Sequence, residues 1–168
     1  MKNQNKVQFI ILGFLIQIPL SGYELKKRME LSVANFMSPS FGNIYPTLKY
    51  LAEKGFITSS QEEGLRHKKV YTATVSGTTH FLKWLTSDPD EPFLARVFFM
   101  NLIAKEERTK LIEKHIEGLN EELRHLTFLE ENYGDIMGEF PYQTLSYGKY
   151  ITQKEVEYYQ KRLKGEKT

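Results

Sequence analysis

The chain has 168 residues, of which 40% are hydrophobic and 26% are charged, a balance that is typical of globular proteins and excludes global disorder. It contains no cysteine, which excludes a disulfide framework, a thiolate zinc site and a cysteine nucleophile. The formal net charge of +2 averages two unlike halves: residues 1–84 hold 11 Lys and Arg against 5 Asp and Glu, whereas residues 85–168 hold 12 against 16. The basic first half suggests a polyanionic partner.

The first apolar run, residues 7–20, follows two lysines and superficially resembles a secretory signal peptide. Gln8 and Gln17 interrupt the run, no small-x-small cleavage site follows it, and it is shorter than the ~20 residues that a membrane span needs. We therefore expect a buried helix from about Lys6 to Gln17, stopped by Pro19, in a cytoplasmic protein with no membrane partner.

The rest of the basic half is predicted to contain three more helices and a two-stranded β-ribbon. A capping box formed by Ser21 and Glu24 opens the first of these helices. Gly55 is placed to end the second one. Two β-rich runs on either side of a polar, Gly-containing loop favour a hairpin. The expected elements are helices 21–34, 40–54 and 76–85, and strands 56–59 and 69–73.

After a polar stretch with two prolines at residues 86–92, the acidic half is predicted to be helical throughout. Five apolar residues of the longest helix follow the 4-3-4-3 spacing of a heptad seam. Two heptads are too few for an independent coiled coil, so we expect this seam to meet a partner surface in a homodimer. The expected helices are 93–103, 105–133 and 142–163, and the seam residues are Ile112, Ile116, Leu119, Leu123 and Leu126.

The order of three helices and then a two-stranded ribbon is that of a winged helix-turn-helix. The expected fold is therefore mainly α with a small β-ribbon: a DNA-binding winged helix-turn-helix domain at 1–87 and a helical dimerisation domain at 88–168. Helix 40–54 would enter the major groove, and the wing, residues 59–72, would lie on the backbone or in the minor groove.

Polar and cationic side chains are concentrated where such a domain meets DNA. The polar side of helix 40–54 is expected to present Ser40, Asn43, Tyr45, Thr47 and Lys49. Of these, Asn43 and Thr47 suit base edges, whereas cations at the wing tip suit phosphates. The full set of expected DNA contacts is Tyr23, Lys26, Lys27, Ser40, Asn43, Tyr45, Thr47, Lys49, Arg66, His67, Lys68 and Lys69.

Several motifs of this half, in order and at the right spacings, are similar to those of the PadR family of bacterial transcription regulators. The matching segments are LSGYEL at 20–25, SPSFGNIYPTLKYL at 38–51, EKGFI at 53–57, RHKKVY at 66–71 and TVSG at 74–77. The C-terminal half, with its segment TLSYGKY at 144–150, more loosely resembles the larger type of the family. Asn43 and Tyr50 depart from the family's usual Ser and basic residue, so the preferred operator is expected to differ.

The resemblance implies a homodimeric DNA-binding repressor that recognises a pseudo-palindromic operator and is released by a small aromatic or hydrophobic effector. Effectors in the family include phenolic acids and hydrophobic cations. The resemblance also implies a ligand pocket between the winged domain and the C-terminal helices. Its candidate residues are Trp84, Phe93, Phe98, Phe99, Tyr147 and Tyr150. Aromatic residues at helical spacing also build protein cores, and this second interpretation stays open.

No catalytic or metal-ligating set is visible. The chain lacks a Walker loop, a dinucleotide-binding glycine pattern and a nucleophile elbow, and none of its four histidines stands four residues from another. We therefore expect no enzymatic activity, no cofactor and no metal site. Two other functions remain open: a helical protein-interaction adaptor, which would have no use for a basic wing tip, and a small-molecule-binding protein without DNA binding.

Overall fold

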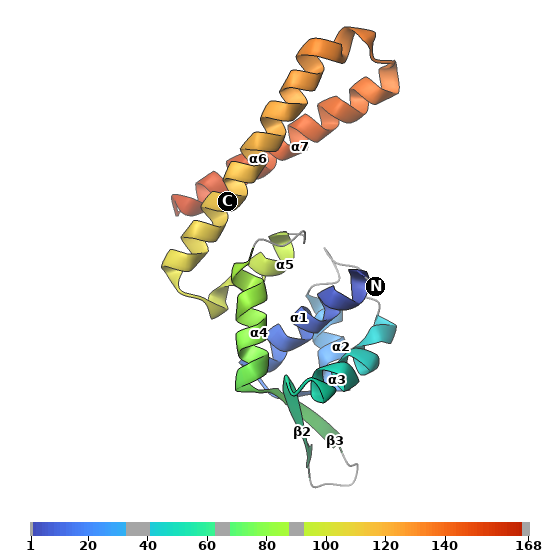
Figure 1. The fold of residues 1–168 in the computed structure, drawn as a ribbon, viewed down its shortest axis with the longest axis vertical. Coiled ribbons are helices and arrows are strands. Elements are labelled where there is room, and N and C mark those ends of the chain that lie inside the picture. Colours follow the sequence, from blue (N-terminus) through green and yellow to red (C-terminus); the bar gives the residue numbers. More distant parts are fainter. Residues whose placement is uncertain (1, 33–40, 63–67, 88–92, 166–168) are drawn as a thin grey trace. The chain divides into compact units, whose positions relative to one another are not determined.

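The computed structural model describes residues 2–32, 41–62, 68–87 and 93–165 of the chain, which divides into two compact units, residues 1–103 and 104–168. The first unit consists of helices and a small β-sheet, and the second is a pair of long helices (Figure 1). The predicted fold class, mainly α with a small β-ribbon, is confirmed. Within the described residues, no helix combines the length and hydropathy that a membrane span requires.

Four helices surround the apolar core of the N-terminal unit: α1 (Lys2–Gln17), α2 (Gly22–Leu31), α3 (Ile44–Glu53) and α4 (Val75–Thr86). The central element is α1, which packs against α3, α4 and a strand of the sheet. Residues 10–15 of α1 are all buried, so the helix is covered by protein on every side along this stretch. The first apolar run therefore forms the centre of a folded domain, as predicted.

The ends of α2 and α3 are set by residues with capping chemistry. The Ser21 Oγ accepts a hydrogen bond from the Glu24 backbone N–H (3.3 Å), and the Glu24 carboxylate accepts one from the Ser21 backbone N–H (2.9 Å), which is the predicted capping box. A 3-10 turn, η2 (Phe41–Asn43), precedes α3, and Pro46 is the third residue of α3, where no intrahelical N–H bond is lost. Gly55 follows α3 with a φ of +70°, the left-handed conformation that ends many helices.

The wing belongs to a three-stranded antiparallel sheet in the order β1-β3-β2. Strands β2 (Ile57–Glu62) and β3 (Lys68–Ala73) form the predicted hairpin. The additional strand is β1 (Leu20–Ser21), whose Leu20 pairs with Tyr71 of β3. Sequence analysis missed β1 because two residues are too few to show the alternation of a strand. Through β1, the wing is hydrogen-bonded to the residues that lead into α2.

Thr74 and Gly77 hold the wing against the start of α4. The Thr74 Oγ1 donates a hydrogen bond to the Gly55 carbonyl (2.8 Å) and accepts one from the Gly77 N–H (3.0 Å), so Thr74 caps α4 while binding the residue that ends α3. Gly77 lies directly on the carbonyl oxygen of Phe56, and a Cβ there would be 2.0 Å from that oxygen. The Thr-x-x-Gly motif thus fixes α3, β2 and α4 relative to one another.

The single helix predicted at 93–103 is wrong. Two short helices occupy this stretch, α5 (Phe93–Val97) and η3 (Met100–Leu102), and the backbone turns between them. The turn places Phe99 in the core, where its side chain is fully buried. A continuous apolar run shows that a segment is buried, but it does not show where the chain must bend to bury it.

Arg96 binds α5 to the end of α4. Its Nε and Nη2 donate hydrogen bonds to the Leu85 carbonyl at 2.9 and 2.7 Å, and Nη2 also donates to the Ser87 carbonyl. These carbonyl groups lie at the C-terminus of α4, where no following N–H of the helix can bind them and the helix dipole favours a positive charge. These contacts join α5 to α4 within the first compact unit, which runs to residue 103.

The C-terminal unit is an antiparallel hairpin of α6 (Lys105–Tyr133) and α7 (Glu139–Leu163), joined by a 3-10 turn, η4 (Gly134–Ile136). Near the start of α6, His115 Nε2 lies 3.0 Å from Glu155 Oε1, close to the end of α7. Near the end of α6, the Glu130 carboxylate accepts a hydrogen bond from Lys149 Nζ (2.5 Å). The predicted helix 105–133 is confirmed, whereas the last helix starts at Glu139, three residues earlier than predicted.

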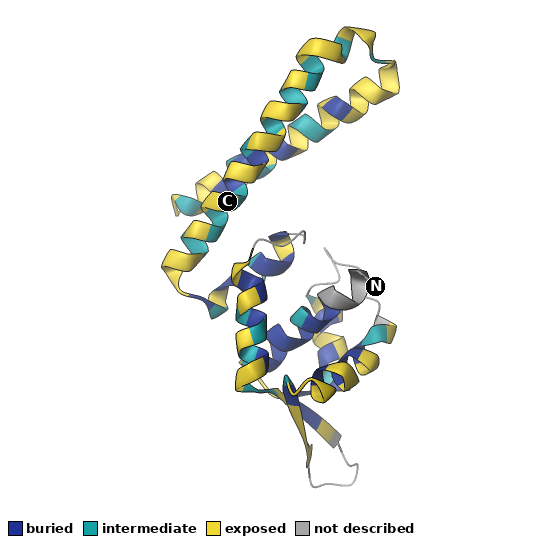
Figure 2. Cartoon of the chain, in the orientation of Figure 1, coloured by how far each residue is buried: buried dark blue, intermediate teal, exposed yellow. Residues whose placement is uncertain are grey.

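The predicted heptad seam of α6 packs against α7 of the same chain. Ile116 and Leu119 are buried, and Ile112, Leu123 and Leu126 are half-buried. The α7 residues buried in return are Leu145, Thr152, Val156 and Tyr159. The sequence predicted that this seam meets a partner surface. For its two buried residues, Ile116 and Leu119, α7 of the same protomer supplies that surface. Figure 2 shows that most of the other residues of α6 and α7 are exposed.

Candidate nucleic-acid interface

Helix α2 presents three of the predicted contacts on its outer side. Leu25 and Met29 face the core. Tyr23, which is 70% exposed, and the neighbouring Lys26 and Lys27 face solvent. This division follows from the helical period, since Leu25 and Met29, four residues apart, lie on one side of α2, and Tyr23, Lys26 and Lys27 lie away from that side.

Helix α3 presents Tyr45 and Lys49, and its inner side packs through Ile44, Leu48 and Leu51. Asn43, just before α3, is half-buried, and its side chain makes no capping hydrogen bond to the helix. The expected position of Thr47 on the polar side is wrong: only 6% of Thr47 is exposed. Thr47 lies one helical turn from both Ile44 and Leu51, on the buried side of α3.

The wing contributes through β3. Lys69 is exposed, and its Nζ lies 5.5 Å from the centroid of the Tyr71 ring, because residues two apart in a strand share a face. Lys68 also lies in β3. The other predicted contacts Ser40, Arg66 and His67 lie outside the described residues. Tyr71, which shares this face with Lys69, is itself buried.

The ring of Tyr45 connects α3 to the start of α2. It lies on Gly22, so close that a Cβ at this glycine would be 2.7 Å from Tyr45 Cε1. Burial, with a smaller contribution from the nearby Tyr45, raises the pKa of the Tyr71 hydroxyl. The Tyr45 side chain therefore lies near both Gly22 at the start of α2 and Tyr71 in β3. The Tyr71 ring in turn lies near the Lys69 ammonium group.

Two of the lysines on this surface already have anionic neighbours. Lys26 Nζ lies 3.7 Å from Glu30 Oε1, and Lys49 Nζ lies 3.9 Å from Glu53 Oε1. Both pairs are i,i+4 contacts on exposed helix faces, where such pairs contribute only about 0.2–1 kcal/mol. A phosphate group can therefore replace the carboxylate at little cost.

The surface formed by Tyr23, Lys26, Lys27, Tyr45, Lys49 and Lys69, called the basic face below, has the chemistry of a DNA contact. Ammonium groups bind phosphate oxygens, and tyrosine hydroxyls donate hydrogen bonds to them. An exposed helix face flanked by a second helix and a β-hairpin fits a major groove about 12 Å wide. No group of three or more metal-ligating side chains occurs among the residues that the structure describes.

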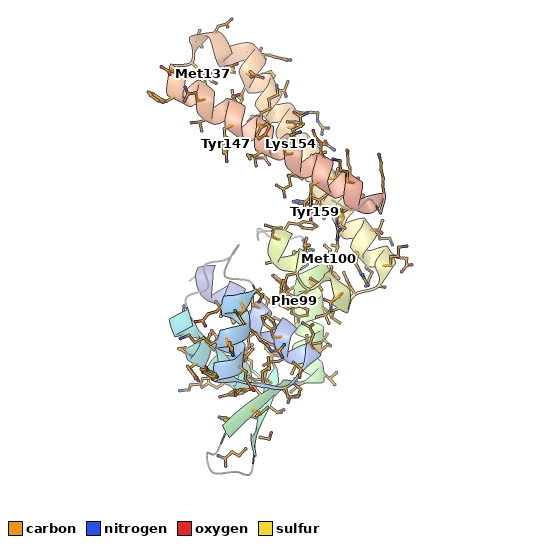
Figure 3. The ribbon with its side chains drawn as sticks, turned by 180° about the vertical axis from the view of Figure 1, so that it is seen from behind. Phe99, Met100, Met137, Tyr147, Lys154 and Tyr159 are labelled. Carbon is orange, nitrogen blue, oxygen red and sulfur yellow. The ribbon has the colours of Figure 1, made fainter. Side chains whose placement is uncertain are left out.

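The candidate effector residues fall into two sets. Tyr147 and Tyr150 are exposed on α7. Phe98 and Phe99 belong to the N-terminal unit, where the Phe99 ring makes edge contacts with Phe14 (5.6 Å), Phe81 (5.5 Å) and Phe98 (4.8 Å) (Figure 3). Phe99 is fully buried, so its role is that of a core residue.

Trp84 differs from the other aromatic residues of the core. Its indole stacks on Phe9 with 4.7 Å between ring centroids, and Trp84 is 8% exposed. The buried Nε1–H of Trp84 has no hydrogen-bond partner among the described residues. A buried donor without an acceptor is costly, so an acceptor from a bound molecule would stabilise this position. Phe93, on α5, is buried as well.

Two family models match the chain. The transcriptional regulator PadR-like family matches residues 11–83, which include α2, α3 and the wing. The virulence activator alpha C-terminal family matches residues 91–164, which include α6 and α7.

Several known proteins that this chain resembles are named as transcriptional regulators. The negative transcriptional regulator PadR of Bacillus subtilis is 27% identical over 156 residues, 86% of this chain and 84% of that protein. The transcriptional regulator YqjI of Escherichia coli is 35% identical over 86 residues, 51% of this chain and 39% of that protein. A crystal structure of Bacillus subtilis PadR in complex with operator DNA is 24% identical and covers 94% of this chain and 97% of that one, with a TM-score of 0.48. The same protein has been solved in complex with p-coumaric acid, with a TM-score of 0.45 and coverage of 95% and 94%.

Proposed function

Because the chain belongs to the PadR-like family of transcriptional regulators, we propose that it represses transcription as a homodimer bound to operator DNA. The observation that supports this most directly is the basic face, on which α2, α3 and β3 together expose lysines and tyrosines. We propose a cytoplasmic location, because a repressor acts where the DNA is. The family is one of regulators, and no catalysis is proposed.

Each element has a separate part in this proposal. Helix α3 enters the major groove, where the Asn43 amide reads a base edge and Tyr45 and Lys49 flank it. Lys26 and Lys27 on α2 bind the phosphates of one strand, and Lys69 binds those next to the wing. The proposal also assigns Ser40, Arg66, His67 and Lys68 to DNA contact.

A symmetric dimer determines the form of the operator. Two copies of α3 related by a two-fold axis would read two half-sites about 34 Å apart, or a multiple of that distance. The preferred operator is then a pseudo-palindrome. The C-terminal hairpin supplies the dimer contacts, and the half-buried seam residues Ile112, Leu123 and Leu126 contribute to them where α7 leaves them uncovered.

Selection of bound DNA from a random-sequence pool tests this function. Wild-type protein should enrich a pseudo-palindrome, and Asn43→Ala should change the enriched bases at one position of each half-site while reducing the affinity for DNA in general by less. Asn101→Ala, which removes an exposed amide outside the basic face, is the matched control and should enrich the wild-type sequence. Absence of any enriched sequence, or an equal loss on all sequences with Asn43→Ala, would contradict the proposal.

We further propose that a small aromatic or hydrophobic effector releases the repressor and binds near Trp84. The buried indole N–H without an acceptor supports this site. Trp84 is the single tryptophan of the chain, so its fluorescence reports binding directly. Titration with p-coumaric acid, and separately with a hydrophobic cation, should quench this fluorescence and release bound DNA over the same concentration range. Release of DNA without quenching would mean that the effector binds away from Trp84. If a ligand causes no quenching and no release of DNA, its class is excluded as the effector.

A further inference from the structure

The exposed face of α3 has two flanks. Tyr45 occupies one flank, where its ring lies on Gly22 at the start of α2. At 3.6 residues per turn, Tyr50 lies about 140° and Lys54 about 180° further round the helix axis than Tyr45. Tyr50 is 44% exposed, and Lys54, which follows the last residue of α3, is exposed as well. These two residues form the flank opposite Tyr45, called the distal flank below.

The ammonium group of Lys54 lies on the Tyr50 ring, with 5.8 Å between Nζ and the ring centroid. Among the residues that the structure describes, no carboxylate forms an ion pair with Lys54, whereas Lys26 and Lys49 are each paired with a glutamate. The face of an aromatic ring attracts a cation but does not neutralise its charge. The Lys54 ammonium group is therefore held in place and can still bind an anion.

The backbone at Lys54 is also fixed. Its N–H donates a hydrogen bond to the Tyr50 carbonyl (3.0 Å), and the carbonyl of the next residue, Gly55, accepts one from Thr74 Oγ1 (2.8 Å). Lys54 is thus anchored to α3 on one side and, through Gly55, to the start of α4 on the other. A lysine side chain loses rotamer freedom when it binds, and one that is already positioned loses less.

A major groove about 12 Å wide is filled by one helix, and the phosphates of the two strands form its two walls. The lysines of α2 are placed to reach the wall beside Tyr45. We propose that Lys54 binds a phosphate of the opposite strand and that Tyr50 positions its ammonium group for this contact. The proposal rests on the DNA-binding function proposed above and adds a contact on the second wall of the groove.

A lysine at the end of a helix also interacts with the helix dipole, so the test needs a control for that effect. Lys164 provides it. Lys54 is the C-cap of α3 and precedes Gly55 with a φ of +70°, and Lys164 is the C-cap of α7 and precedes Gly165 with a φ of +76°. Both lysines are exposed. Lys164→Ala therefore removes the same kind of cap lysine away from the basic face.

The salt dependence of DNA binding tests the phosphate contact. Fluorescence anisotropy would use the duplex enriched by wild-type protein and a random-sequence duplex of the same length. Lys54→Ala should lower the slope of log affinity against log salt concentration by about 0.9 on both duplexes, which weakens binding about 8-fold at ~0.1 M salt. Lys164→Ala should leave the slope unchanged. An unchanged slope with Lys54→Ala, or an equal fall with Lys164→Ala, would overturn the contact.

Two substitutions of Tyr50 test its positioning role. Tyr50→Phe keeps the ring and should bind DNA as wild type does. Tyr50→Leu removes the ring but leaves the lysine charge, so affinity should fall about 3-fold with an unchanged salt slope. In Lys54→Ala protein, Tyr50→Leu should cause no further loss. A loss that persists in that protein would mean that Tyr50 contacts DNA itself, and it would overturn the positioning role.

Duplexes with a single neutral methylphosphonate test which strand Lys54 reaches. The phosphate bound by a lysine is the one whose replacement weakens wild-type protein but not the alanine variant of that lysine. Within one half-site, the phosphate found with Lys54→Ala should lie on the strand opposite the one found with Lys26→Ala. Both phosphates on the same strand would overturn the assignment of Lys54 to the second wall.

The two duplexes separate this proposal from the proposed function. If wild-type protein enriches an operator but Lys54→Ala leaves the slope unchanged, the contact is wrong and the operator function stands. If wild-type protein enriches no sequence but Lys54→Ala lowers the slope on the random duplex, the contact is right and the operator function is wrong.

Discussion

The ring of Tyr45 lies on the backbone of Gly22, with 2.7 Å between Tyr45 Cε1 and the position of a Cβ at the glycine. The contact joins the exposed side of α3 to the first turn of α2. Tyr45 is still 61% exposed, so its ring is positioned without being buried. Ser21, the residue before Gly22, pairs with Val70 of β3, so the start of α2 contacts both the Tyr45 ring and the wing.

Replacement of Gly22 with alanine should therefore weaken DNA binding more than it weakens the fold. The new methyl group would displace the Tyr45 ring, which can rotate towards solvent, and we expect operator affinity to fall about 10-fold, or ~1.4 kcal/mol. Fluorescence anisotropy with labelled operator measures this. Gly118→Ala is the control, because nothing lies within 4 Å of a Cβ there, and it should leave affinity unchanged. Equal affinities of wild type and Gly22→Ala would show that the ring position does not matter.

Gly77→Ala should destabilise the N-terminal unit strongly. The Cβ would meet the Phe56 carbonyl oxygen at 2.0 Å, and a backbone atom cannot move aside as a flexible side chain can. We expect a loss of about 3 kcal/mol in the free energy of unfolding, measured by urea denaturation. Ser76→Ala, at the exposed neighbouring position, should change it by less than ~0.5 kcal/mol. A similar stability for both variants would contradict the close packing at Gly77.

Lys69→Ala should reduce the salt dependence of DNA binding. Each phosphate that a lysine neutralises adds about 0.9 to the slope of log affinity against log salt concentration, so the slope should fall by about 1 with every DNA sequence. Lys161→Ala, which removes an exposed lysine of α7, is the matched control. An unchanged slope with Lys69→Ala would remove β3 from the phosphate contacts.

Thr47→Ala should act on stability and leave the choice of DNA sequence unchanged. Thr47 is buried on the inner side of α3, so its side chain is not available to a base edge. We expect a loss of about 1 kcal/mol in unfolding free energy and the same selected operator as wild type. A changed base preference with wild-type stability would mean that α3 turns when it binds DNA.

Tyr159 should make the stability of the hairpin sensitive to alkaline pH. Burial, with help from the charges of Glu155 and Tyr158, raises the pKa of Tyr159 to about 12 from an ordinary value of 10.0. The folded state favours the neutral phenol, so its contribution is fully present below about pH 10 and is lost as pH rises through about 12. Tyr159→Phe should flatten the fall in unfolding free energy between these values. An identical pH profile for both proteins would show that Tyr159 ionises as easily folded as unfolded.

Local spacing in the sequence was enough to predict most of the helices, the hairpin and several helix ends. The capping box at Ser21 and the glycine after α3 occur as predicted because a cap depends on residues within a few positions of each other. The family motifs likewise identified the winged domain, since each motif marks a turn or cap with its own local geometry. The exposed positions of Tyr23, Lys26, Tyr45 and Lys49 follow from the helical period in the same way.

Only the tertiary structure showed what each apolar or polar helix face contacts. The heptad of α6 predicted an apolar face, yet only the fold shows that α7 of the same chain packs against it, with Ile116 and Leu119 buried. Thr47 is polar in sequence but buried because α3 packs on that side, and β1 exists because β3 lies beside it. Periodicity depends on neighbours along the chain, whereas burial depends on residues that are distant in sequence, and this is why the sequence alone could not decide these contacts.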